Sequence, residues 1–286
     1  MSYEGQDAPL DYYPCRYGTS NTVFRGPETG LDGAYTVVLG GSETYGRFVE
    51  DPFCDRTGEL TGRKVVNLGV QNGSVDVFAQ DIDLMPVING AEIVVVQVMG
   101  AHNISNRFYS VHPRRNDRFL RHSILMETLF PDIDFSDFSF TRHMLSALCH
   151  VSPDKFALVV QELRDAWVAR MRLMLSRIRG RKVLLWIENS SADDLGAEPL
   201  FVTLEMLQKL EGQINKVVHC DVQAEQGIDH LEGMLFGETD REAALRCMSA
   251  AAHDHVAHDL ALALGRQDGQ RLTIENGAQG RRLKSA

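Results

Sequence analysis

Five apolar runs, dense in Val, Ile and Leu, punctuate the chain and show no alternation with polar residues. They span residues 34–39, 64–70, 91–99, 182–187 and 214–222. A continuous apolar run of this length is typical of a strand that is buried on both faces, as in a parallel sheet. We predict that each run forms one strand.

Helix-like segments lie between and after these runs. They span residues 42–50, 74–88, 153–179, 200–210 and 249–264, and Ser249 is the expected N-cap of the last one. In the longest segment the apolar residues recur at helical spacing from Phe156 to Ile178. Strands that alternate with helices require right-handed crossovers and helices on both faces of the sheet. The pattern therefore predicts an α/β fold, a flavodoxin-like three-layer sandwich around a five-stranded parallel sheet.

The remaining segments suggest one domain with additions. Residues 100–152 follow the third predicted strand and are too many for a simple loop, so we expect a partly helical insertion that caps the strand ends. Residues 1–33 are rich in Tyr, Pro, Gly and Asp and are expected to form an arm packed on the domain. The domain itself spans residues 34–265, and the polar residues 266–286 are expected to form a flexible tail.

Composition narrows the class of protein. The formal net charge of −10 argues against nucleic acid as a partner, because binding a phosphate backbone needs a basic face. Five scattered cysteines without a CxxC pair suggest neither a disulfide framework nor a zinc site, and no cofactor or metal is expected. No apolar run approaches the roughly 20 residues of a membrane span, and the first residues lack the apolar core of a signal peptide. We expect a cytoplasmic protein, and the oligomeric state stays open.

Three successive strand ends carry polar groups that suit acyl transfer. The first predicted strand ends in Gly40-Gly41-Ser42, the second leads into the glycine-bearing turn 67–74, and the third leads into residues 100–106. Ligands of α/β sheets bind at such ends. Together they would deliver a hydroxyl, backbone N–H groups and an Asn amide, which are the parts that an acyl-transfer site needs. Taken alone, the motif favours a simpler interpretation, in which Ser42 is the N-cap of a helix.

These motifs resemble those of the SGNH (GDSL-type) hydrolases. Residues 40–46, Gly-Gly-Ser-Glu-Thr-Tyr-Gly, resemble the first block of that superfamily, Gly-Asp-Ser-x-Thr-x-Gly, with Gly41 in place of Asp. Residues 67–74 and 100–103 are similar to the second and third blocks, and the order is kept through residues 34–265. The opening 11–18, Asp-Tyr-Tyr-Pro-Cys-Arg-Tyr-Gly, also resembles an uncharacterised bacterial family, which supplies no activity.

The resemblance implies a role for each matching residue. Ser42 would be the nucleophile, and its own N–H would be one oxyanion donor. Asn72 or Gly73 would supply a second N–H. Asn103 would be the side-chain donor, although strict spacing places His102 there.

The fourth block of the superfamily, Asp-x-x-His, is only half present. The matching residues are Ala250 to His253, so His253 would be the base, and Ala250 stands where the Asp is expected. Asp221 or Asp229 could take the place of that carboxylate from elsewhere in the chain. His253 and the nearby His255 could instead be polar core or surface residues.

Substrate contacts are expected beyond the third strand. His102 and Asn106 lie close to its end, and Arg114 with Arg115 follow in a basic stretch suited to a carboxylate, phosphate or sulfate group. The alternative for the two arginines is a surface loop paired with acidic neighbours.

These residues favour a serine-dependent esterase or acyltransferase that acts on a small-molecule or carbohydrate-linked acyl ester. The missing Asp favours an alternative, a non-catalytic relative that binds an anionic sugar or a protein partner. A third hypothesis is a sulfotransferase-like protein, since residues 16–20, Arg-Tyr-Gly-Thr-Ser, faintly resemble the phosphosulfate loop of that class. No apolar strand precedes that stretch, as a phosphate loop would require.

Overall fold

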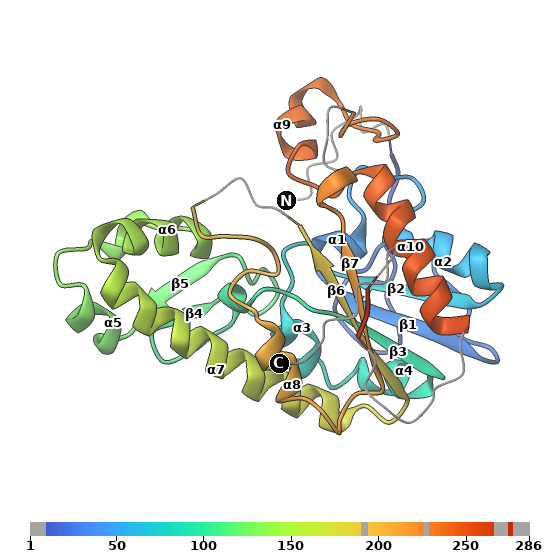
Figure 1. Cartoon of the computed structure of the whole chain (residues 1–286), viewed down its shortest axis with the longest axis horizontal. Helices are drawn as coiled ribbons and strands as arrows, with labels where there is room; N and C mark the ends of the chain where they lie inside the picture. The colour runs from blue at the N-terminus through green and yellow to red at the C-terminus, as the bar shows by residue number, and fades with distance from the viewer. Residues whose placement is uncertain (1–9, 190–193, 226–228, 266–273, 277–286) are drawn as a thin grey trace.

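The predicted strands form one parallel sheet at the centre of the computed structural model, which describes residues 10–189, 194–225, 229–265 and 274–276 (Figure 1). The strand order is β2-β1-β3-β6-β7, the flavodoxin-like order that was predicted. All five predicted runs are confirmed, as β1 (Tyr35–Gly40), β2 (Lys64–Gly69), β3 (Ile93–Gln97), β6 (Arg181–Glu188) and β7 (Lys216–Asp221).

A further strand, β8 (Ile274–Asn276), pairs in parallel with β7 at the edge of the sheet. Its three residues lie within the segment that was predicted as a flexible tail, but the structure places them in the sheet. The rest of the tail, 266–273 and 277–286, and the first nine residues of the arm lie outside the described residues.

Helices cover both faces of the sheet, which gives the three predicted layers. One face packs against α2 (Phe53–Thr61) and α10 (Ala250–Gly265), which lie side by side in Figure 1 and share one apolar cluster with it. The other face packs against α3 (Val75–Gln80), α4 (Met85–Gly90), α7 (Pro153–Arg177) and α8 (Leu204–Gln208). Alternate residues of each strand enter the two clusters, as the period of two requires.

Three predicted helices are shorter than expected, and of the segment 200–210 only α8 is helical. The segment 42–50 forms only α1 (Ser42–Tyr45), because Gly46 ends it in a left-handed conformation with φ 70°. The segment 74–88 divides into α3 and α4. The predicted N-cap of the last helix is confirmed, since Ser249 Oγ accepts the N–H of Ala252 at 3.1 Å.

The insertion after β3 is partly helical, as predicted, and also contains a small antiparallel sheet that was not predicted. It comprises η1 (Ala101–Asn103), β4 (Tyr109–Val111), β5 (Phe119–His122), α5 (Ile124–Leu129), η2 (Phe135–Asp137) and α6 (Thr141–Val151). Figure 1 shows it as a lobe beside the sheet. Where the structure describes the segment between β7 and α10, it forms three short helices, η3 (Gln223–Glu225), η4 (Glu238–Asp240) and α9 (Arg241–Ala244).

The described part of the arm packs on the domain through Tyr17 and Phe24, which are buried in the main core cluster. The five cysteines are free thiols. Among the described residues, no helix has both the length and the apolar character that a membrane crossing requires.

Candidate functional site

Ser42 lies at the start of α1, directly after β1. The N-cap of that helix is Gly41, and Ser42 is its first helical residue. The alternative that Ser42 is the cap is therefore wrong. The helix rests on the neighbouring strand so closely that a Cβ on Gly69 would lie 2.2 Å from Tyr45 N. Two glycines at strand ends, Gly40 and Gly69, thus let the helix approach the sheet.

The hydroxyl of Ser42 is hydrogen-bonded to the turn after β2. The N–H of Asn72 donates to Ser42 Oγ at 2.9 Å, and Ser42 Oγ lies 3.3 Å from Asn72 Oδ1. Asn72 adopts a left-handed conformation with φ 53°, which Asn tolerates better than most residues. The structure thus brings together two of the predicted site residues.

Gly73 does not fit the role of oxyanion donor. Its N–H donates to Val70 O at 2.9 Å and closes the turn after β2. A backbone N–H engaged in this way is not available to a substrate. Of the two predicted residues at this strand end, Asn72 is the one whose N–H points at the serine.

Asn103 is held in place by the insertion. Its side chain is 7% exposed, and its Oδ1 accepts the hydroxyl of Thr141 at 2.6 Å. Thr141 also donates its backbone N–H to Asp117 O at 2.9 Å. With Oδ1 used as an acceptor, the Nδ2 group is the part of the Asn103 side chain that can donate to a ligand.

A carboxylate that the sequence did not indicate completes this network. Asp117 Oδ2 accepts Asn72 Nδ2 at 3.1 Å, so Asp117 is linked to Ser42 through one side chain. Burial raises the pKa of Asp117 above its ordinary value, while hydrogen bonding by Asn72 and the charges of Arg118 and Arg115 oppose the shift. The preceding Asn116 fixes the loop, since its Oδ1 accepts both the N–H and the hydroxyl of Ser74 at 2.8 Å.

The four predicted substrate-binding residues divide into two buried or engaged side chains and two exposed ones. His102 is buried in η1, and Asn106 uses its Oδ1 to accept the N–H of Phe108 and its Nδ2 to donate to Ile104 O, both at 2.8 Å. Asn106 therefore stabilises its own loop. Arg114 and Arg115 are exposed in the loop that leads to Asp117, and Arg115 lies close enough to influence its pKa.

The surroundings of His253 contradict its predicted role as the base. The side chain is 1% exposed and stacks on Phe53 of α2 with the rings 5.9 Å apart. Its Nδ1 accepts the N–H of Phe53 at 3.1 Å, so the nitrogen without a proton is already occupied. Burial lowers the pKa of His253 to about 3, helped by the charges of Arg25 and Arg56. His253 is a neutral residue that stabilises the start of α2.

Other residues proposed for the base or its carboxylate are also engaged elsewhere. His255 lies between Glu225, with Oε1 2.7 Å from Nδ1, and Asp259 of the same helix. Asp221 is exposed, and its Oδ1 accepts the N–H of Gln223 at 3.1 Å. Asp229 is also exposed, and its backbone carbonyl oxygen accepts the N–H of Glu232 at 2.9 Å. Within the described part of the chain, both hydrogen bonds of the Ser42 hydroxyl involve Asn72, and no imidazole takes part.

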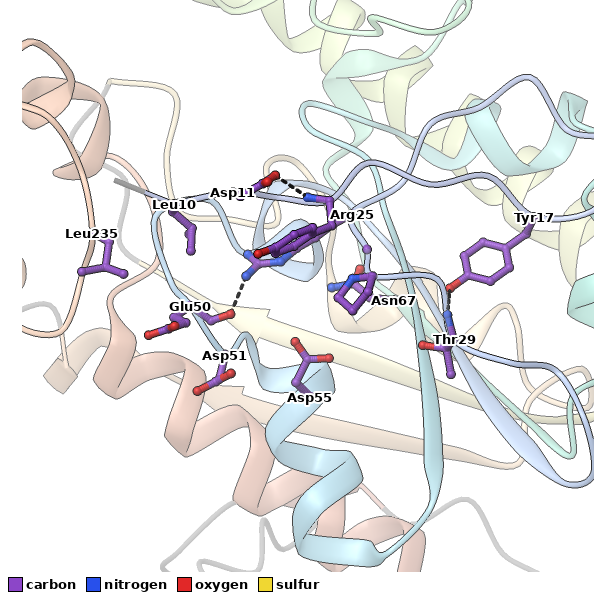
Figure 2. Close-up of a pocket in the computed structure, with 13 residues that line it drawn as sticks. Leu10, Asp11, Tyr17, Arg25, Thr29, Glu50, Asp51, Asp55, Asn67 and Leu235 are labelled. Carbon is purple, nitrogen blue, oxygen red and sulfur yellow. Dashed lines mark hydrogen bonds between the residues drawn. The ribbon is translucent and has the colours of Figure 1, made fainter. Parts of the chain in front are cut away.

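The arm contacts and stabilises residues 46–50, which follow α1. Arg25 is buried, and its Nη1 donates to Gly46 O while its Nη2 donates to Val49 O at 2.7 Å. Figure 2 shows this guanidinium reaching Glu50 O beside a cavity of about 510 Å³ between the arm and α2. The residues that line this cavity do not include Ser42.

The arm contains no phosphate cradle at residues 16–20. Ser20 Oγ donates to Asp81, and Thr19 Oγ1 donates to Asp83 at 3.2 Å. Tyr17 is buried in the core. A loop tied to two carboxylates would repel an anion, which contradicts the sulfotransferase-like hypothesis.

Comparisons with known proteins give a family and distant structural likenesses. The family model described as "Domain of unknown function (DUF6473)" matches residues 1–268. No curated protein matches the sequence. A catalytic mutant of an acetylxylan esterase from Geobacillus stearothermophilus is 14% identical with a TM-score of 0.41, over 82% of this chain and 95% of that one.

A protein described as lipolytic and of the G-D-S-L family, from Desulfitobacterium hafniense, is 13% identical with a TM-score of 0.39, over 80% of this chain and 99% of that one. Likenesses this distant carry no information about the chemistry of this chain.

Proposed function

The chain belongs to the family described as domain of unknown function (DUF6473), and we propose from its site that it is a serine-dependent esterase or acyltransferase for a small or carbohydrate-linked acyl ester. The observation that carries this proposal is the position of the Ser42 hydroxyl at the end of β1, where the N–H of Asn72 donates to it. We assign the amide of Asn103, whose Oδ1 accepts the hydroxyl of Thr141, as the side-chain donor.

Each donor has a place in the proposed reaction. Ser42 Oγ attacks the acyl carbonyl, and the carbonyl oxygen becomes an oxyanion. The N–H group of Ser42 and the Nδ2 group of Asn103 stabilise that charge, as preorganised donors do in acyl transfer. The N–H of Asn72 donates to Ser42 Oγ before the attack and turns to the oxyanion once Oγ has become an ester oxygen. The alkoxide leaves, and water or an acceptor hydroxyl then takes the acyl group from Ser42.

Asp117 is the residue that we assign to proton transfer in place of His253. Within the described residues it is the ionisable group joined to Ser42 through a single intervening side chain, that of Asn72. An amide does not relay protons, so one water molecule between Ser42 Oγ and Asp117 carries the proton. Asp117 accepts it during attack and returns it to the leaving alkoxide. A raised pKa makes this carboxylate a stronger base than an exposed one.

Labelling by a fluorophosphonate probe tests this proposal. The wild-type protein should be labelled at Ser42, and Ser42→Ala should abolish labelling with an unchanged melting temperature. Asp117→Asn should lower the labelling rate by about 100-fold, the size of a typical general-base contribution. Asp132→Asn, an exposed carboxylate of the same insertion, is the matched control and should label like wild type. Equal rates in the Asp117→Asn and control variants would remove Asp117 from the reaction.

A second candidate is a non-catalytic protein that binds an anionic sugar or a protein partner through the same strand ends. The observation that favours it is the hydrogen bonding of Ser42 to an amide, with no imidazole involved. It predicts a wild-type protein that resists the probe, with Ser42→Ala changing neither labelling nor stability.

A further inference from the structure

The two glycines before Ser42 differ in the space around them. A Cβ on Gly40 would lie 1.9 Å from Thr44 Oγ1 and 2.4 Å from Gln97 Oε1, which no side chain can do. A Cβ on Gly41 would find its nearest atoms at 3.5 Å, an ordinary contact distance, and the φ of Gly41 is −91°. Position 40 therefore requires glycine, because Thr44 and Gln97 lie too close for a side chain, whereas position 41 has room for one.

Two oxygen atoms are nearest to the Cβ position of Gly41, a carboxylate oxygen of Glu43 and the backbone carbonyl oxygen of Gly73, both at 3.5 Å. Glu43 Oε2 lies 3.5 Å from the Cβ position of Gly41, because the Glu43 side chain folds back along α1 toward the N-cap. The resembled motif, Gly-Asp-Ser, carries a carboxylate on the residue that Gly41 replaces. In this chain a carboxylate occupies that volume but comes from a residue two positions later.

Gln97 joins this carboxylate to the turn. Its Nε2 donates to Glu43 Oε2 at 2.6 Å, and its Oε1 accepts both the N–H of Gly41 at 2.9 Å and the hydroxyl of Thr44 at 2.6 Å. Gln97 is the last residue of β3 and is 4% exposed. One buried amide thus fixes the residue before Ser42 and the two residues after it.

We propose that Glu43 is a positioning residue, which supplies from α1 the carboxylate that the resembled motif carries before the serine and so holds Gln97 and the Ser42 turn in register. The inference rests on the proposed function for its effect on reactivity. Glu43 acts through Gln97 and Gly41 and does not touch the hydrogen-bonded oxygen of Ser42.

The orientation of Gln97 is what the carboxylate controls. A carboxylate accepts hydrogen bonds only, so it selects the rotamer in which Nε2 faces Glu43 and Oε1 faces Gly41. Without an acceptor at that place, the amide can flip, and Nε2 would then face the N–H of Gly41. Two facing donors would displace the N-cap and with it Ser42.

Moving the carboxylate back to position 41 tests the proposal. Glu43→Ala should lower the maximal labelling rate of Ser42 by about tenfold, since a small misplacement of a nucleophile is costly, with little change in probe affinity. Glu43→Ala should also lower the melting temperature. Adding Gly41→Asp to this variant should restore most of the labelling rate and most of the melting temperature. Gly41→Ala with Glu43→Ala is the matched control and should restore neither. Glu43→Gln keeps an acceptor oxygen and should label like wild type.

Gly41→Asp alone gives the sharpest contrast. In the wild-type background two carboxylates would share one volume, so this substitution should lower both the melting temperature and the labelling rate, whereas beside Glu43→Ala it should raise them. Equal effects in both backgrounds would overturn the proposal.

If the wild-type protein is not labelled at all, the proposed function fails, and the melting temperatures of the same five variants still decide whether the two carboxylates are interchangeable. The absence of any thermal rescue by Gly41→Asp would then reject the role of Glu43 independently of catalysis.

Discussion

The ends of β1, β2 and β3 and the first turns of α10 each carry residues that the motif resemblance singled out, but the two regions differ in what the fold does with them. At the strand ends, Ser42, Asn72 and Asn103 belong to one network with Thr141 and Asp117. At α10, the imidazole of His253 is enclosed against α2. At the strand ends the polar side chains form a hydrogen-bond network, whereas at α10 a polar side chain is packed in the core.

Spacing along the chain predicts which residues meet at the strand ends, but it does not predict the direction of a helical side chain. Parallel strands end at a common edge, so residues that follow them meet there whatever their neighbours are. The direction of a helical side chain depends on the face of the helix on which it lies. His253 lies on the buried face of α10 with Val256, Ala257 and Leu260. That i, i+3, i+4, i+7 stripe was readable in the sequence and indicates burial of the histidine.

The largest expected effect concerns the glycine that lets α1 approach the sheet. Gly40→Ala should lower the free energy of unfolding by about 4 kcal/mol, because the methyl group would displace Thr44 and Gln97 and break their hydrogen bond. Gly41→Ala is the matched control and should change it by less than about 1 kcal/mol. Chemical denaturation measures both, and equal losses would mean that the strand-end region is not packed as described.

His253→Ala should lower the free energy of unfolding by about 3 kcal/mol, because it leaves a cavity and an unpaired N–H on Phe53. His253→Asn keeps an acceptor near Nδ1 and should lose less than His253→Ala. The folded His253→Asn variant should keep wild-type labelling of Ser42. Loss of labelling in that variant at an unchanged melting temperature would instead make His253 part of the chemistry and abolish the contrast between the two regions.

The pH dependence of stability should report the same histidine. Its pKa is about 3 in the folded protein against an ordinary 6.5, so the unfolded chain takes up the proton first as the pH falls. The stability that the neutral imidazole provides is complete above pH 6.5 and is lost as the pH drops toward 3, at about 1.4 kcal/mol per pH unit at most. Denaturation of wild type and His253→Asn across this range should show this slope as the difference between the two proteins, because the carboxylates with raised pKa values, such as Asp55, titrate in both.

The smallest expected effect lies at the edge of the strand-end region. The charge of Arg115 lowers the pKa of Asp117, as the weakest of the opposing causes, so Arg115→Gln should move the labelling profile of Ser42 to higher pH by a fraction of a unit. Arg114→Gln removes the same charge one residue earlier, where no influence on Asp117 is resolved, and should leave the profile in place. Identical shifts in both variants would point to a general charge effect.

Much of the site's framework follows from local patterns in the sequence. The continuous apolar runs predicted five of the six strands that the described residues form in the sheet, and their order along the chain placed Ser42, Asn72 and Asn103 at one edge of it. Ser249 was recognisable as an N-cap because the cap interaction involves residues only three apart. Such features depend on periodicity and neighbours, which the sequence displays directly.

The partners of these residues could not be read in the same way. Asp117 and Thr141 come from an insertion whose path has no regular period, and Gln97 faces Glu43 only because β1 and β3 are adjacent in the sheet. The sequence determined the α/β fold and the edge at which chemistry would be sought. The tertiary structure decided that His253 is packing, that Gly73 closes a turn, and that a carboxylate lies beside Gly41, because direction and burial of a side chain are set by contacts far away in the chain.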